Sequence, residues 1–262
     1  MSDYDRNVAG RYGTTVTRSE AAIDQGLRSY MLSVYNYMTL GLAITGLAAL
    51  GVFMLSVTTD PSQAAGQVAG GIMLTKFGYA LFVSPLKWVV MLAPLAAVFF
   101  LSFRIQSMSV GAAQATFWVY AGLVGVSLAT IFLVYTHESI VRVFFITAAS
   151  FGALSLWGYT TKRDLSAMGS FLMMGLFGII IASLVNVFLG STMLQFIVSV
   201  VGVLVFAGLT AYDTQRIKEM YFEGDDSVVA GKKAIMGALT LYLDFINMFM
   251  MLLQLFGNRN SN

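Results

Sequence analysis

Two aspartates stand where a charge is costly, within long apolar stretches near the carboxyl end of the chain. Asp244 lies in the middle of ALTLYLDFINMFMMLLQLFG, residues 238–257, and Asp213 lies in GLTAYDTQRIKEMY, residues 208–221. A charged side chain at the centre of a membrane helix costs ~2.5–3.5 kcal/mol on insertion scales. Because intramembrane carboxylates are rare and mark functional sites, both aspartates are candidates for such a site.

Asp244 belongs to a polar stripe on its segment. The stripe follows a 4-3-4-3 spacing, which places its members on one face of a helix. Its members are Thr240, Asp244, Asn247, Met251 and Gln254. Such a face should point toward the interior of a helix bundle or a water-filled path, and not toward lipid.

Two carboxyl groups that meet in a medium of low dielectric cannot both ionise easily, so they tend to share one proton. If their helices converge, Asp213 and Asp244 therefore form a candidate proton sensor and gate. When both are ionised, their oxygens suit transient binding of Ca²⁺ more than of a softer metal, together with the oxygens of Asn247, Thr240 or Thr210. An aqueous path past such a cluster would conduct cations.

Arg104, in FFLSFRIQSM, lies at the inner end of a predicted span and can reach toward the level of the aspartates. Its charge would hold one ionised aspartate and so link two helices, as a latch that protonation weakens. The alternative is that Arg104 only anchors its helix at the interface by snorkelling. Asp213 could likewise form an ordinary ion pair with Arg216, three residues further along.

Membrane helices are the elements that must position these residues. The chain has 262 residues, of which 58% are hydrophobic and 11% charged, and a mean hydropathy of +0.77. Soluble domains contain about 25% charged residues. Cysteine is absent and His137 is the single histidine, which excludes disulfides and thiolate sites and disfavours a zinc site. We expect no resident cofactor, and the net charge of +2 gives no sign of nucleic-acid binding.

Seven apolar runs are long enough to cross about 30 Å of hydrocarbon, which takes ~20 residues each. They are residues 30–57, 85–103, 110–136, 139–159, 165–189, 192–217 and 234–256. The fold class predicted is an all-α membrane protein, a seven-transmembrane-helix bundle. An apolar patch at 77–83 is expected to lie in the interface or to extend the second helix. A six-helix fold with a re-entrant last segment is the alternative, because an aspartate weakens the seventh span.

The chain divides into three predicted parts: a polar cytoplasmic tail, 1–29; the helical domain, 30–257; and a short tail, 258–262. With the amino terminus inside, the inner segments hold eleven Lys and Arg residues and the outer segments hold four. By the positive-inside rule, this predicts a cytoplasmic amino terminus and an outer carboxyl terminus.

GLTAYDTQRIKEMY and LTLYLDFINMF, in this order, resemble the signatures of the transmembrane Bax inhibitor motif (Bax inhibitor-1) family, bacterial branch. SPLKWVVMLAPLAAVFF, residues 84–100, is similar to its proteobacterial members. The resemblance covers 30–257 and implies a seven-helix bundle whose last helix lies at the centre, wrapped by the other six. It also implies a pH-sensitive Ca²⁺ leak, with Asp213 and Asp244 as the paired acids and Arg104 as the latching arginine. The family's run of basic residues is reduced here to Arg104, followed by Ile105 and Gln106.

The sequence therefore predicts a passive, proton-gated cation leak channel for Ca²⁺ in the inner (plasma) membrane, with lipid, Ca²⁺ and protons as its partners. One alternative is an interaction protein that modulates membrane-protein turnover or stress responses, with a membrane-protein partner at the tail 1–29 or the loop 219–226. Another is a proton-coupled cation antiporter. An enzyme is not expected. Tyr212-Asp213 matches half of a diaspartyl intramembrane protease, but residues 241–244 read LYLD where Gly-x-Gly-Asp is required.

Overall fold

The computed structural model describes residues 3–260, with side chains described from residue 24 onward except that of Ala69. In this part of the chain, seven helices are long and apolar enough to cross a membrane. These spans are Asp24–Ser56, Leu86–Ser107, Val110–Val134, His137–Thr160, Ser166–Leu189, Thr192–Glu219 and Ser227–Phe256. The prediction of an all-α membrane bundle with seven spans is confirmed, and the last span is a continuous helix.

The α-helices are α1 Asp3–Ser56, α2 Lys76–Phe82, α3 Leu86–Arg104, α4 Val110–Leu128, α5 Ile131–Val134, α6 His137–Thr160, α7 Ser166–Leu189, α8 Thr192–Glu219 and α9 Ser227–Phe256. Short polar residues begin several of them, because their side chains accept a hydrogen bond from a free backbone N–H of the first turn. Ser191 caps α8 in this way and Asp226 caps α9. Gly190, at φ +61°, ends α7 in a left-handed conformation that glycine adopts without strain.

The two predicted tails are tied to the bundle differently. Helix α1 begins at Asp3 and runs without a break into the first span, so the segment predicted as a tail continues that helix. At the other end, the backbone of Asn258 and Asn260 bonds to Thr136 and Val134, at 3.0 and 2.9 Å. The carboxyl end of α9 is therefore fastened to the turn between α5 and α6. Residues 1–2 and 261–262 of the predicted tails lie outside the described residues.

The connection between the first two spans carries a small sheet that the sequence reading did not predict. Its strands are β1 Val57–Thr58, β2 Gly66–Gln67 and β3 Met73–Leu74, with β3 antiparallel to both others. The 3-10 turns η1 Pro61–Gln63 and η2 Ala69–Gly71 lie between them, and η3 Ile105–Ser107 follows α3. The apolar patch at 77–83 forms α2, a separate helix capped by Thr75.

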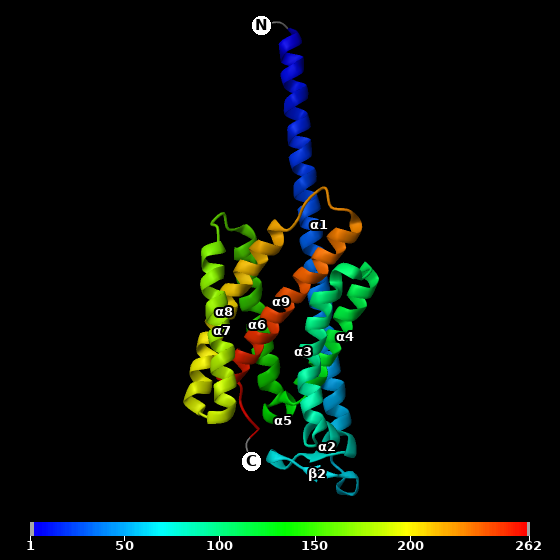
Figure 1. Cartoon of the computed structure of the whole chain (residues 1–262), viewed down its shortest axis with the longest axis vertical. Coiled ribbons are helices and arrows are strands. Elements are labelled where there is room, and N and C mark those ends of the chain that lie inside the picture. Colours follow the sequence, from blue (N-terminus) through cyan, green and yellow to red (C-terminus); the bar gives the residue numbers. More distant parts are fainter. Residues whose placement is uncertain (1–2, 261–262) are drawn as a thin grey trace.

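Helix α9 runs obliquely through the middle of the bundle (Figure 1). It packs mainly on α1, α4, α6 and α8, whereas α3 packs on α4 and α7 packs on α8. The apolar window of α9 is 61% buried inside the protein, against 11% for the spans of α3 and α7. The last helix is therefore the central one, and α3 and α7 form the outer layer.

Glycines let some helices approach closely. A Cβ at Gly158 of α6 would run into the backbone carbonyl of Ala211 on α8, and one at Gly125 of α4 would lie 2.5 Å from the carbonyl oxygen of Thr45 on α1. By contrast, a Cβ at Gly178 of α7 would meet no atom within 4 Å. The α1–α4 and α6–α8 contacts are thus tight, while this face of α7 is open.

Candidate functional site: an aspartate pair beside a groove

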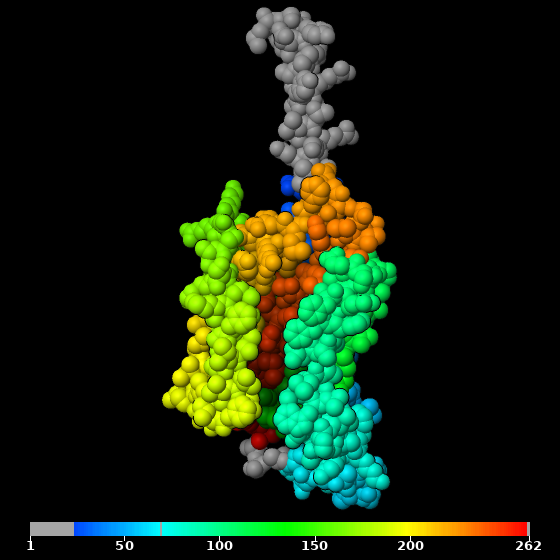
Figure 2. Space-filling model, in the orientation of Figure 1, coloured from blue at the N-terminus to red at the C-terminus, as the bar shows by residue number. Residues whose placement is uncertain are grey.

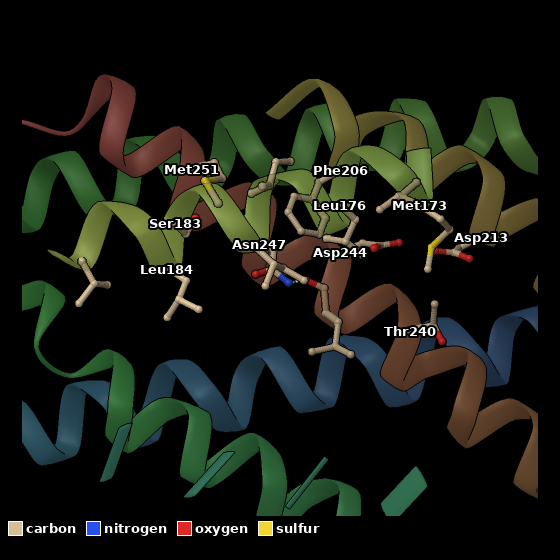
Figure 3. A pocket seen from close by; sticks show the side chains of 15 residues that line it. Met173, Leu176, Ser183, Leu184, Phe206, Asp213, Thr240, Asp244, Asn247 and Met251 are labelled. Atoms are coloured by element: carbon tan, nitrogen blue, oxygen red, sulfur yellow. Dashed lines mark hydrogen bonds between the residues drawn. The ribbon is translucent and has the colours of Figure 1, made fainter. Parts of the chain in front are cut away.

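The structure brings Asp213 of α8 and Asp244 of α9 together. Both side chains are buried, with 9% and 5% of their surface exposed, and their carboxyl groups interact directly. Helices α8 and α9 pack along each other, so the pair spans the contact between the central helix and its neighbour (Figure 3). This is the convergence that a shared-proton sensor requires.

Asp244 lacks a full set of hydrogen-bond partners. Its Oδ2 is buried and accepts no hydrogen bond from any residue in the described part of the chain. A buried polar atom without a partner costs about 1–3 kcal/mol, and such atoms are rare in native proteins. The oxygen is therefore free to accept a hydrogen bond from a ligand or to take up a proton.

The pair borders a groove of about 690 Å³ between α7, α8 and α9. Its α7 wall is mostly apolar, with Met173, Leu176, Ile180 and Leu184, and carries one hydroxyl, that of Ser183. In Figure 2, α9 forms the floor of a groove that lies between α7 and α3. The aspartates are thus reached from the side of the bundle.

The polar stripe of α9 lies in this groove. Thr240, Asp244, Asn247 and Met251 all line it, as expected from their spacing (Figure 3). Thr240 donates its hydroxyl to the carbonyl of Met236, and Asn247 donates its amide to that of Leu243, at 3.1 and 2.8 Å. Both side chains keep an oxygen that can accept a bond from a ligand.

Gln254, the last member of the stripe, is engaged elsewhere. Its Oε1 accepts a hydrogen bond of 2.7 Å from Ser199 of α8. The free part of the stripe therefore runs from Thr240 to Met251.

Thr210 does not belong to the groove. Its side chain is buried and donates to the carbonyl of Phe206, at 2.7 Å, while its own carbonyl accepts from Thr214. Thr210 is not among the residues that line the groove, so the structure does not place it on the predicted cation path.

Arg104 also stands apart from the aspartates. It is exposed at the end of α3, and the ion pair that the described residues do form joins Lys233 to Asp225. Helix α3 packs on α4 and not on α8, so it lies across the groove from Asp213. The structure does not show the predicted latch. The cation that acts on Asp213 is Arg216, on the same helix.

The pair alone is not a preformed metal cage. Among the residues that the structure describes, no group of three or more His, Cys, Asp or Glu side chains could hold a metal ion. Ca²⁺ takes six to eight oxygen ligands, whereas two carboxylates offer at most four. A Ca²⁺ ion held by the pair alone would therefore keep several waters.

Sequence reasoning missed two parts of the site. The apolar wall on α7 carries no chemical signal, because aliphatic side chains also cover lipid-facing surfaces. The second is the support behind α9, where Tyr242 bonds to Thr45 of α1 at 2.6 Å. A tyrosine within an apolar run could have been singled out, because a buried hydroxyl needs a partner.

Comparisons with known proteins agree with the sequence motifs. The family described as inhibitor of apoptosis-promoting Bax1 matches residues 27–261. An uncharacterized protein of Rickettsia prowazekii is 44% identical over 261 residues, which cover 100% of both chains. The inner membrane protein YbhL of Escherichia coli is 47% identical over 236 residues, 89% of this chain and 93% of that protein. A protein of Caulobacter vibrioides is 41% identical over 262 residues, 100% of both.

Proposed function

This chain belongs to the family of the inhibitor of apoptosis-promoting Bax1, and we propose that it is a pH-sensitive leak channel for Ca²⁺. The observation that carries the proposal is the pair of buried, interacting carboxyl groups on the central helix and its neighbour. Packing alone gives no reason for two acids at this depth. Binding a proton or a cation between them would give one.

Protons and Ca²⁺ compete for the same oxygens in this proposal. Two ionised carboxylates repel each other, and either a shared proton or a cation relieves the repulsion. When Asp213 and Asp244 are both protonated, the cation loses its ligands. When they share one proton, a hydrogen bond between them holds α8 to α9. Both protonated forms oppose the cation, so flux should rise with pH as the pair loses its protons.

We place the protein in the inner membrane, where the name of its Escherichia coli relative puts that protein. The excess of Lys and Arg in the predicted inner segments supports a cytoplasmic amino terminus. Asp213, six residues before the end of α8 at Glu219, then lies in the cytoplasmic half of the membrane. Protons from the cytoplasm would reach it first.

A flux assay tests the proposal. The full chain is reconstituted in liposomes that contain a Ca²⁺ indicator, a Ca²⁺ gradient is imposed, and flux is measured from about pH 5 to pH 9, a range that spans ordinary and raised carboxyl titrations. Asp213→Asn and Asp244→Asn should each reduce flux about tenfold or more, which corresponds to ~1.4 kcal/mol, and flatten its pH dependence. The proposal fails if both variants keep wild-type flux and the wild-type pH profile.

Asp164→Asn is the matched control. Asp164 is an exposed carboxylate outside the spans, where it accepts a hydrogen bond from the backbone N–H of Ser166, and asparagine can accept the same bond. The substitution removes one negative charge without touching the pair, so flux should stay unchanged.

Two further arms separate neighbouring mechanisms. A proton gradient imposed without a Ca²⁺ gradient should drive no net Ca²⁺ movement through a leak, whereas an antiporter would couple the two.

Arg104→Ala should leave basal flux unchanged if Arg104 only anchors α3 at the interface. Raised basal flux would instead restore the latch, formed in another conformation.

A further inference from the structure

We propose that the groove between α7 and α9 binds a lipophilic amine that enters from the hydrocarbon of the membrane, with its ammonium group on Asp244 and Asp213. This inference goes beyond the leak, because it concerns an organic ligand and requires no ion flux. It rests on three features of the groove: the way it opens, the atoms it offers and its size.

The groove opens toward lipid. Ile180 and Leu184 of its α7 wall are 53% and 61% exposed, and apolar side chains exposed on a membrane helix face hydrocarbon. Helix α3 does not cover the groove, since α9 is visible between α3 and α7 (Figure 2). A ligand dissolved in the membrane can therefore enter without crossing the bundle.

The polar atoms of the groove suit an ammonium group. Asp244 presents a buried Oδ2 that lacks a hydrogen-bond partner in the described part of the chain, and Asp213 lies against it. An –NH₃⁺ group has three donors and no acceptor, so two or three acceptors satisfy it. A bare divalent cation needs six to eight oxygens, more than the two carboxylates offer alone, so it would also have to draw on Thr240, Asn247 or water. The α7 wall is aliphatic apart from Ser183, and its apolar side chains would pack against the ligand's hydrocarbon.

The size and depth of the groove narrow the ligand further. Its volume of about 690 Å³ falls in the range of ~300–1,000 Å³ that is usual for small-molecule sites. Asp244 lies twelve residues before the end of α9 at Phe256, or about 18 Å along the helix. An amine that is part of a lipid headgroup at that end of α9 does not reach this depth. Asp213 lies nearer the opposite interface, about 9 Å from the end of α8, so the test below uses a lipid without a primary amine. The volume of the groove suits a free amine with a compact apolar body.

Binding of a cage amine tests the inference. The full chain is placed in nanodiscs of phosphatidylcholine alone, a lipid without a primary amine, and titrated with 1-aminoadamantane by calorimetry, with empty nanodiscs subtracted. The neutral 1-adamantanol has the same shape and serves as the ligand control. Saturable binding should be about tenfold or more tighter for the amine, since a charge-assisted bond distinguishes the two.

Two variants locate the site. Asp244→Asn should weaken binding of the amine about tenfold or more while leaving binding of the alcohol unchanged, and Asp164→Asn should bind as the wild type. Ser183→Leu fills the groove from α7 and leaves both acids intact, so it should weaken binding of both ligands. If Asp244→Asn does not fold, Ser183→Leu still tests whether the ligands bind in the groove.

The inference is overturned if amine and alcohol partition equally, or if amine binding survives both Asp244→Asn and Ser183→Leu. It is also distinguishable from the leak. Amine binding that depends on Asp244 in a protein without Ca²⁺ flux would support the groove site and reject the leak. Flux that depends on Asp244 without saturable amine binding would do the reverse.

Discussion

The two faces of α9 treat buried polar groups in opposite ways. Tyr242 is fully buried against α1 and α4, where its hydroxyl lies 2.6 Å from Thr45 and its ring meets Phe117 and Tyr120 edge to face. Asp244, two residues further along, faces the groove with Oδ2 unpaired among the described residues. Two residues turn a helix by about 200°, so these side chains point to opposite sides.

The difference separates a structural from a functional use of polarity. The Thr45 hydroxyl lies 3.0 and 2.9 Å from the carbonyl oxygens of Gly41 and Ala121, and when its single proton goes to one of them it accepts from Tyr242. The hydroxyls of Tyr242 and Thr45 thus both have partners, and such networks stabilise a unique packing. The groove side lacks such a network. The unpaired Oδ2 of Asp244, next to Asp213, is able to bind a proton, a cation or an ammonium group.

We call the side of α9 that carries Tyr242 the closed face and the side that carries Asp244 the open face. The largest effect is expected from a cavity on the closed face. Tyr242→Ala removes a fully buried ring that contacts two aromatic side chains and leaves a cavity between α9, α1 and α4. The free energy of unfolding should fall by ~3–5 kcal/mol, as for other aromatic truncations in cores. Unfolding of the purified protein, followed by circular dichroism during titration with denaturing detergent, measures the change.

Leu243→Ala is the matched truncation on the open face. Leu243 lines the groove and is only half-buried, so its loss should cost less than half as much. Equal losses for the two variants would mean that the two faces of α9 are packed alike, and the comparison would break.

A second test concerns how closely helices approach on each side. Gly158→Ala places a methyl group against the backbone carbonyl of Ala211, so α6 and α8 must separate. Overpacking of this kind costs ~1–3 kcal/mol. Gly178→Ala, on α7, adds the same methyl group where no atom lies within 4 Å, and should leave the unfolding free energy within about 0.5 kcal/mol of wild type.

The sequence predicted the spans and the stripe because both follow from distances along one helix. A run of about twenty apolar residues crosses the membrane, and a 4-3 spacing aligns Thr240, Asp244 and Asn247 whatever surrounds them. The pairing of Asp213 with Asp244 could also be predicted from the sequence. Their helices are joined by a short loop, so they are neighbours, and each acid needs a partner.

The predictions about Arg104 and Thr210 depended on which helices are neighbours in the bundle, and the sequence does not give this. Depth in the membrane placed Arg104 level with the aspartates, but depth does not say which neighbour a helix packs on, and α3 packs on α4. Thr210 lies near Asp213 along the chain, yet its hydroxyl bonds to its own backbone. The groove itself arises from an α7 wall of ordinary aliphatic residues, which no motif marks.

A substitution on the open face should raise the free energy of unfolding and abolish function. Asp244→Leu replaces an orphaned buried carboxyl by an apolar side chain of similar size, and removes its repulsion with Asp213. The free energy of unfolding should rise by ~1–3 kcal/mol, the usual cost of an unsatisfied buried polar group, while flux is lost. A destabilised Asp244→Leu protein would show that the carboxyl is a structural partner, and would remove the contrast with Tyr242.

The smallest effect probes the hydroxyl of Tyr242 alone. Tyr242→Phe keeps the ring between Phe117 and Tyr120 and deletes only the donor to Thr45, whose own hydroxyl still donates to a backbone carbonyl. One net hydrogen bond is lost, so the unfolding free energy should fall by about 1 kcal/mol, with flux and its pH profile unchanged. Thr45→Val, which removes the shared acceptor as well, tests the same network from α1. A flux change in Tyr242→Phe without a stability change would mean that the closed face takes part in gating.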